Sequence, residues 1–180
     1  MQEFRKMRRA DKEKSAEWCR ALLEEGTRRH WAGMLGLNGE NGYPYVVPVD
    51  YIYDETYDRE HIWFHSALKG LKLECIKKDP RICMTVAAKD QEGRESYMLS
   101  AEQEAALGRN QDYTCHFGSV VVYGKARIVE DEGKKLEVLD LLNRQRTPEF
   151  YERGRKEIEM QAKHCCVVEI EIEHMTGKGI

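Results

Sequence analysis

Alternation of apolar and polar residues predicts that most of this chain forms short β-strands. The clearest case is 164–173, where Val168, Ile170 and Ile172 alternate with glutamates. This period of two predicts a strand with one buried face and one solvent face. β-branched, aromatic and other apolar residues predict five more strands, at 31–37, 43–53, 61–64, 81–88 and 113–129.

Other stretches repeat their apolar residues with the helical period of 3.6. These predicted helices cover 15–26, 68–78 and 134–143, and a further one starts at Thr147-Pro148. Ser15 is the expected N-cap of the first helix and Ser66 that of the second. A capping-box pattern at 100–103, followed by Gly108, predicts a short helix there.

The order of these elements favours an antiparallel sheet. The polar segment 38–42, NGENG, is typical of a hairpin turn because its residues tolerate positive φ. Six strands joined mostly by turns, with helices beside them, favour a closed or partly closed barrel.

Composition indicates one domain over residues 1–180, with a net charge of −3. This charge argues against nucleic-acid partners. No window approaches the roughly 18 apolar residues that a membrane span needs, and the N-terminus lacks the apolar core of a secretory signal. A cytoplasmic protein with no membrane partner is therefore expected.

The six cysteines contain no C-x-x-C pair, so we expect reduced thiols and no metal site. Residues 1–14 form a basic N-terminal arm, in which Phe4 and Met7 suggest packing against the body. The polar segment 89–112 is long for a connection within one domain, which is typical of a lid, an arm or a disordered insertion.

The strongest chemical signal is the corner from 63 to 81, where a strand leads into a helix. A turn is expected at residues 65–67. Ser66, Gly70 and Lys72 would put free backbone N–H groups and an ammonium at the helix start, a suitable site for phosphate. An ordinary corner with a solvated lysine is the alternative. Pro48 marks an edge or a bend in its strand, where free backbone groups could meet a ligand, or simply a plain edge strand.

Five segments together resemble a known family. They are FRKMRR near the start, then GYPYVVPVDYIYD, WFHSALKGLKLECIKKDPR and SVVVYGKARIVED, and finally EIEHMTGK. Their order and spacing are similar to those of the nitroimidazole-resistance (Nim) branch of the pyridoxamine 5'-phosphate oxidase-like flavoproteins.

The resemblance implies an α+β, mainly β fold: a six-stranded antiparallel split β-barrel with flanking helices that binds FMN at a homodimer interface. Backbone groups of 48–51 would face the flavin ring, while His65 and Ser66 would line the phosphate and ribityl side. Lys72 would pair with the phosphate. The implied cofactor-binding residues are Pro48, Val49, Asp50, Tyr51, His65, Ser66, Ala67, Lys72 and Ser119.

The implied activity is that of an FMN-dependent oxidoreductase that reduces a small electron-poor acceptor such as a 5-nitroimidazole. His65 is the catalytic candidate, as a proton donor, or else a structural hydrogen-bonding residue. The alternatives are a flavin or haem carrier or sensor without turnover, and a pyridoxamine 5'-phosphate oxidase that would need basic residues near the flavin. Asp50 departs from the family pattern, which often has an amide at this position. An anion beside a flavin would hinder electron uptake unless it is paired or turned away.

Overall fold

The computed structural model describes residues 4–89, 102 and 117–179. Apart from Glu102, the predicted helix at 100–108 lies outside the described residues. So does almost all of the 89–112 insertion, together with the first residues of the strand predicted at 113–129.

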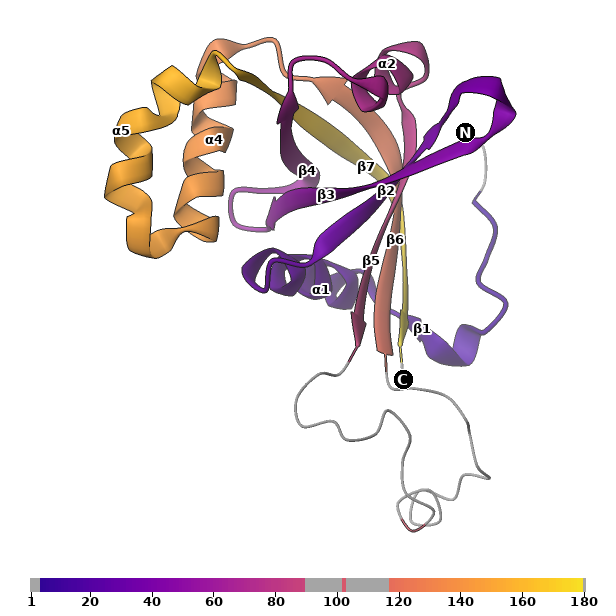
Figure 1. Cartoon of the computed structure of the whole chain (residues 1–180). Helices are drawn as coiled ribbons and strands as arrows, with labels where there is room; N and C mark the ends of the chain where they lie inside the picture. The colour runs from indigo at the N-terminus through magenta and orange to yellow at the C-terminus, as the bar shows by residue number, and fades with distance from the viewer. Residues whose placement is uncertain (1–3, 90–101, 103–116, 180) are drawn as a thin grey trace.

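The described residues form one antiparallel sheet whose long strands close into a ring (Figure 1). The strands are β1 (Glu13–Lys14), β2 (Ala32–Asn38), β3 (Pro44–Asp54), β4 (Asp58–Ala67), β5 (Arg81–Lys89), β6 (Phe117–Ile128) and β7 (Cys165–Gly179). Their order is β1-β7-β4-β3-β2-β5-β6, and a further pairing of β6 with β7 joins the two sides. The predicted mainly β fold with six principal strands is therefore confirmed, with β1 as a short addition.

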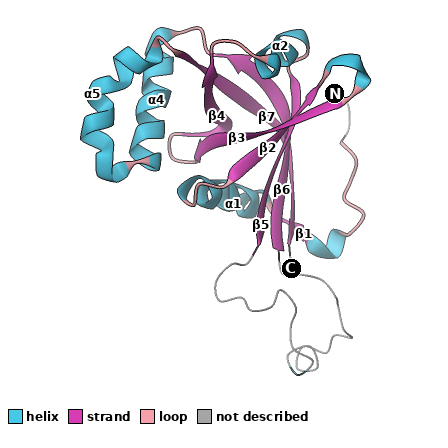
Figure 2. Cartoon of the chain, in the orientation of Figure 1, coloured by secondary structure: helices cyan, strands magenta, loops and turns pink. Residues whose placement is uncertain are grey.

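Helices lie outside the ring (Figure 2). They are α1 (Ala16–Arg28), α2 (Leu71–Lys78), α4 (Glu132–Arg146) and α5 (Tyr151–Ala162), with short 3-10 helices at Ala10–Lys12, Glu40–Gly42 and Pro148–Phe150. Ser15 caps α1 as predicted, since its hydroxyl accepts a hydrogen bond from the Trp18 N–H at 3.2 Å. Among the described residues, no helix combines the length and apolar character needed to cross a membrane.

Two apolar clusters hold the fold together. The larger fills the ring with inward side chains such as Leu35, Phe64 and Val122, and it includes Leu23 of α1 and Leu73 of α2. The smaller lies on the outer side of the sheet, where Ile52, Trp63 and Val167 pack against Val138, Leu141 and Leu142 of α4. Helix α4 therefore covers part of the outer face of the sheet, which a simple alternation of apolar and polar residues would leave exposed to solvent.

That cover corrects one prediction. The first half of β7 is buried on both faces, because Val167 packs under α4 and Glu169 is only 6% exposed. The Glu169 carboxylate accepts a hydrogen bond from Arg127 at 2.8 Å and lies 3.1 Å from His61 Nε2. The expected solvent face therefore begins only at Glu171.

The corner after β4 also differs from the prediction. Residues 65–67 do not turn; they continue β4 and pair with β7 through Ser66↔Cys166. Helix α2 starts at Leu71, and its N-cap is Gly70, with φ 139° and ψ 162°, rather than Ser66. Pairing with β7 keeps Ser66 extended, which outweighs its local preference for a cap.

The N-terminal arm packs on the body, as predicted. The Phe4 ring stacks on His174 with ring centroids 4.4 Å apart. Farther along, Glu13 and Lys14 form β1 and pair with the end of β7. These contacts tie the arm to the outer surface of the ring.

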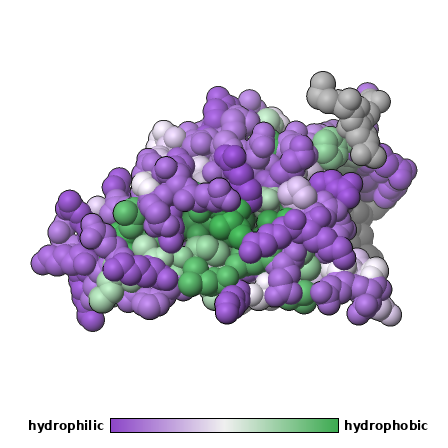
Figure 3. Space-filling view, turned by 90° about the horizontal axis from the view of Figure 1, so that it is seen from above, coloured by the Kyte–Doolittle hydropathy of each residue, from purple (hydrophilic) through white to green (hydrophobic). Residues whose placement is uncertain are grey.

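Some large apolar side chains remain on the outside of the ring. Met34 of β2 is 44% exposed and Val46 of β3 is 56% exposed. Pro48 lies opposite Met34 in the β2–β3 ladder. Figure 3 shows apolar surface gathered in the middle of one face of the molecule, bordered by hydrophilic side chains.

Candidate functional site

The site begins where β3 and β4 separate. β3 pairs with β2 from Pro44 to Asp50, but its ladder with β4 includes only Tyr51 and residues after it. The two strands therefore diverge on the N-terminal side of Tyr51, so the prediction of an edge position at Pro48 is confirmed on the side of β4. The divergence leaves space between two strands of the ring.

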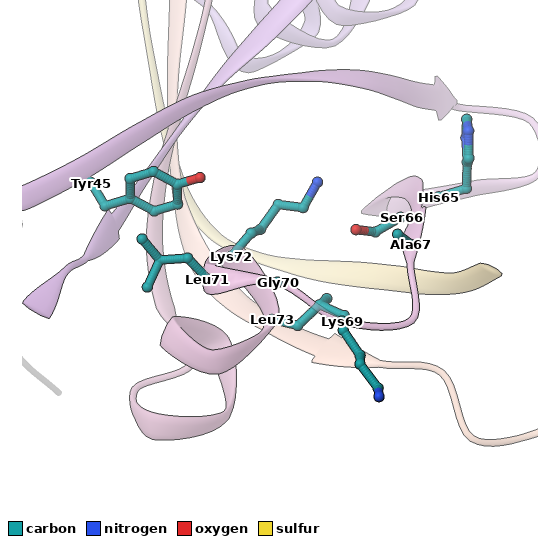
Figure 4. A pocket seen from close by; sticks show the side chains of 9 residues that line it. All are labelled: Tyr45, His65, Ser66, Ala67, Lys69, Gly70, Leu71, Lys72 and Leu73. Atoms are coloured by element: carbon teal, nitrogen blue, oxygen red, sulfur yellow. The ribbon is translucent and has the colours of Figure 1, made fainter. Parts of the chain in front are cut away.

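A hollow of about 430 Å³ lies in this region. Its walls come from β3, from the end of β4 and from the first turn of α2 (Figure 4). The lining residues are Tyr45, His65, Ser66, Ala67, Lys69, Gly70, Leu71, Lys72 and Leu73. The volume is within the range of small-molecule sites, roughly 300–1,000 Å³.

Three polar groups converge on this hollow. The side chains of Lys72, Ser66 and Tyr45 turn toward one another, whereas Lys69 points away (Figure 4). Within the described part of the chain, none of these three has a hydrogen-bond or ion-pair partner. Three converging groups with no partner among the described residues are available to bind a ligand.

Lys72 is the most informative of the three. Burial lowers the pKa of its ammonium below the usual 10.5. Its Nζ lies 5.1 Å from the centroid of the Phe64 ring, a cation–π contact. A half-buried cation that has no carboxylate partner among the described residues suits an anionic ligand.

The start of α2 strengthens this anion site. Gly70 provides no side-chain cap, while its carbonyl accepts hydrogen bonds from Leu73 and Glu74. The N–H groups of Leu71 and Lys72 belong to the first turn, so they have no acceptor within the helix. The partial positive charge of the helix start adds to that of Lys72.

A second hollow of about 380 Å³ adjoins the first and shares His65 with it. Its walls come from α4 and α5, from Asp50 within β3, from the end of β4 and from the start of β7. Its lining residues are Asp50, His65, Leu139, Leu142, Asn143, Arg146, Gln161, His164 and Cys165. Asp50 forms an ion pair here with Arg146, whose side chain is only 7% exposed.

The two hollows gather most of the residues predicted for the site. His65, Ser66, Ala67 and Lys72 line the first, while Asp50 and again His65 line the second. The His65 imidazole has no hydrogen-bond partner among the described residues.

The remaining predicted residues line neither hollow. The side chains of Val49 and Tyr51 point into the core at 5% and 0% exposure, so only their backbones could face a ligand, as the resemblance implies. Pro48 is exposed on the outer face. The Ser119 hydroxyl donates to the Lys178 carbonyl at 3.4 Å instead of reaching either hollow.

Several lining residues were missed in the sequence. Tyr45 lies in the segment GYPYVVPVDYIYD. Because alternate residues of a strand share a face, its side chain could have been placed on the same face as Val47. Arg146, Gln161 and His164 carry no local signal. Only the packing of α4 and α5 against the ring brings them to the site.

Comparison with known proteins agrees with this fold. A model of the family described as pyridoxamine 5'-phosphate oxidase matches residues 15–179. The chain belongs to this family. Membership confirms the resemblance found in the sequence, whereas no curated protein gave a match.

Solved structures show the same fold as this family member. The flavocytochrome Anf3 from Azotobacter vinelandii has a TM-score of 0.70 at 23% identity, with 97% of this chain and 72% of that chain covered. A candidate 5-nitroimidazole antibiotic resistance protein from Bacteroides thetaiotaomicron has a TM-score of 0.60 at 20% identity, covering 87% and 81%. The FAD and heme binding protein from Mycobacterium smegmatis has a TM-score of 0.66 at 16% identity, covering 93% and 73%.

Proposed function

We propose that this protein is an FMN-dependent oxidoreductase that passes electrons to a small electron-poor acceptor such as a nitroaromatic compound. FMN would supply the redox chemistry, and the protein would supply binding, orientation and electrostatics.

Lys72 is the observation that carries this proposal. A half-buried ammonium is unfavourable unless a negative charge compensates it. No described residue provides that charge. The phosphate of a mononucleotide would provide it, while the Ser66 and Tyr45 hydroxyls could donate to the remaining phosphate oxygens.

The adjoining hollows suit a ligand with two unlike ends. The first is polar and cationic, whereas Leu139, Leu142 and Cys165 give the second an apolar wall. FMN has a doubly charged phosphate at one end and a flat, largely apolar ring at the other. We infer that the ring extends toward the second hollow, past His65.

Under this proposal, His65 would lie near the flavin ring and could supply a proton. Its imidazole borders both hollows and is free of partners among the described residues. An imidazole can hold a proton near neutral pH and donate it to an acceptor that gains electrons. We assign His65 this role of proton donor.

The structural relatives support a flavin as the class of cofactor. They include a flavocytochrome and a protein that binds FAD and heme. FMN is preferred here because the first hollow offers one cluster of phosphate-binding groups.

We propose further that two copies of the chain associate through the outer face that carries Met34 and Val46. Exposed apolar residues on a sheet face favour burial against a partner. A second copy could also bring its own Ser119 toward the flavin, which would account for the implied role of a residue that lines neither hollow in one chain.

A titration of the purified, flavin-free protein tests the cofactor. We expect FMN to bind with quenched fluorescence, Lys72→Met to weaken this binding, and a nitroimidazole to reoxidise the bound, reduced flavin. FAD and haem are titrated in parallel, because preferential binding of haem, seen as a Soret band, would favour a carrier or sensor. A wild-type protein that binds no flavin would contradict the proposal.

A further inference from the structure

The ion pair between Asp50 and Arg146 has a marked asymmetry in burial. The Asp50 side chain is 52% exposed, whereas that of Arg146 is 7% exposed. An exposed carboxylate is solvated by water and needs no buried partner, whereas burying a guanidinium is unfavourable. The pair therefore calls for an explanation beyond surface charge.

Arg146 is held firmly in this position. Its Nη1 donates to the Thr27 carbonyl at 2.9 Å, and its Nη2 donates to the Tyr51 carbonyl as well as to Asp50. Tyr51 is fixed in turn, because its hydroxyl donates to the Leu23 carbonyl at 2.9 Å. One guanidinium from the last turn of α4 thus joins the end of α1 to β3.

The location of this pair connects it to the proposed chemistry. Asp50 and Arg146 both line the second hollow, together with His65. A lone carboxylate beside a flavin ring would oppose reduction, because the ring gains negative charge when it accepts electrons. The positive charge of Arg146 would neutralise the Asp50 carboxylate and so remove this obstacle to reduction.

We propose that Arg146 is a positioning residue that neutralises Asp50 and holds the β3 backbone at Tyr51, so that a flavin bound here accepts electrons readily. This inference rests on the proposed function, since it concerns the same cofactor. The charge that neutralises Asp50 comes from α4, a segment outside the motifs that resemble the family.

A merely structural ion pair would behave differently. Its loss would weaken the attachment of α4 to β3 and would lower the stability of the fold. It would change the binding of oxidised and reduced flavin by the same factor. The ratio of these two affinities therefore separates the two roles.

The test measures the Kd of oxidised FMN and, without oxygen, the Kd of reduced FMN, for the wild type and four variants. We expect Arg146→Met to weaken the binding of reduced FMN relative to oxidised FMN by roughly tenfold or more. We expect Asp50→Asn to shift the ratio in the opposite direction, and the double variant to return it close to the wild-type value. Arg144→Met is the matched control: it removes an exposed guanidinium from the same helix and should leave the ratio unchanged.

Each outcome has a distinct meaning. If FMN binds but neither Arg146→Met nor Asp50→Asn changes the ratio, the ion pair is structural and this inference is wrong, while the proposed function stands. If the wild type binds neither form of FMN, both are wrong. Because the Asp50 side chain is half-exposed, Asp50→Asn should fold. Its affinity ratio therefore tests the inference even if Arg146→Met does not fold.

Discussion

At the scale of single residues, Lys72 combines partial burial with the lack of a counter-ion among the described residues. Burial disfavours its charge, and the Phe64 ring offsets only part of that effect. Such an arrangement lowers the stability of the flavin-free protein and favours an anionic ligand.

Replacing Lys72 with methionine should separate binding from stability. We expect Lys72→Met to weaken FMN binding by about 1.5–3 kcal/mol, the value of a hydrogen bond to a charged group, or roughly 10- to 100-fold. The Tm of the flavin-free protein should be unchanged or higher, because a buried charge is removed. Lys69→Met is the control, since that side chain points away from the hollow (Figure 4). An equal loss of affinity in both variants would argue against a phosphate contact at Lys72.

The pH dependence follows from the lowered pKa of Lys72. The folded protein releases this proton at a lower pH than the unfolded chain, whose lysine has a pKa near 10.5. The free energy of unfolding of the flavin-free protein should therefore rise between these two pKa values, because the burial penalty disappears with the charge. FMN affinity should fall over the same range. The FMN affinities of the wild type and Lys72→Met, measured as a function of pH, should converge at high pH. A difference in affinity that stays constant with pH would exclude Lys72 as the titrating group.

His65 should affect turnover far more than binding. We expect His65→Gln to retain FMN while reducing the rate of acceptor reduction by about 100-fold or more, since it removes a proton donor. Stopped-flow reoxidation of the reduced flavin measures this rate. His30→Asn serves as the control, because asparagine tolerates the positive φ of 57° at that exposed position. Similar rates in wild type and His65→Gln would assign His65 a structural role.

At the scale of elements, the start of α2 depends on Gly70. Its φ of 139° and ψ of 162° lie in a region that is open essentially to glycine alone. This conformation lets the chain leave β4 and enter the helix at Leu71, so that Lys72 faces the hollow. Nothing lies within 4 Å of a Cβ added at Gly70, so the restriction concerns the backbone.

Substitution of Gly70 should therefore affect both stability and the site. We expect Gly70→Ala to cost about 1–3 kcal/mol of folding free energy and to weaken FMN binding. Gly42 also has a positive φ, of 77°, and also has open space around it, but it lies in the β2–β3 turn. Gly42→Ala should lower stability and leave FMN affinity unchanged, as measured by denaturant unfolding and FMN titration. If both variants bind FMN like the wild type, the start of α2 does not position the ligand.

At the scale of the whole molecule, the ring leaves apolar side chains on its outer face. Met34 and Val46 are on neighbouring strands, and both side chains are exposed. The proposed dimer would bury these residues. The flavin site would then depend on assembly as well as on the single chain.

A charge at this face should break the proposed dimer. We expect Met34→Glu to give monomers by light scattering and to reduce FMN affinity, because a glutamate would have to be buried without a partner. Met160→Glu, at a site on α5 that is 57% exposed, should leave the oligomeric state unchanged. A wild type that is monomeric at all concentrations would contradict the two-copy site.

Local patterns predicted most elements but misjudged the start of α2, the burial of the first half of β7, and the ends of β4 and β7, which extend to Ala67 and Gly179. Strands with clear alternation and the Ser15 cap agree with the structure, because their causes lie within a few residues. The start of α2 was predicted too early, since pairing of Ser66 with Cys166 outweighs the helical spacing of Leu68 and Leu71. The buried half of β7 was missed because α4, which covers it, is elsewhere in the sequence.

The sequence by itself determined the strands, the family and the presence of His65, Ser66 and Lys72 on one corner. These properties depend on neighbouring residues and on the order of motifs. Only the tertiary structure decided that Lys72 is half-buried without a counter-ion in the described chain and that Asp50 is paired with Arg146. Burial and ion pairing depend on which distant segments pack together, and here the divergence of β3 from β4 and the position of α4 set both.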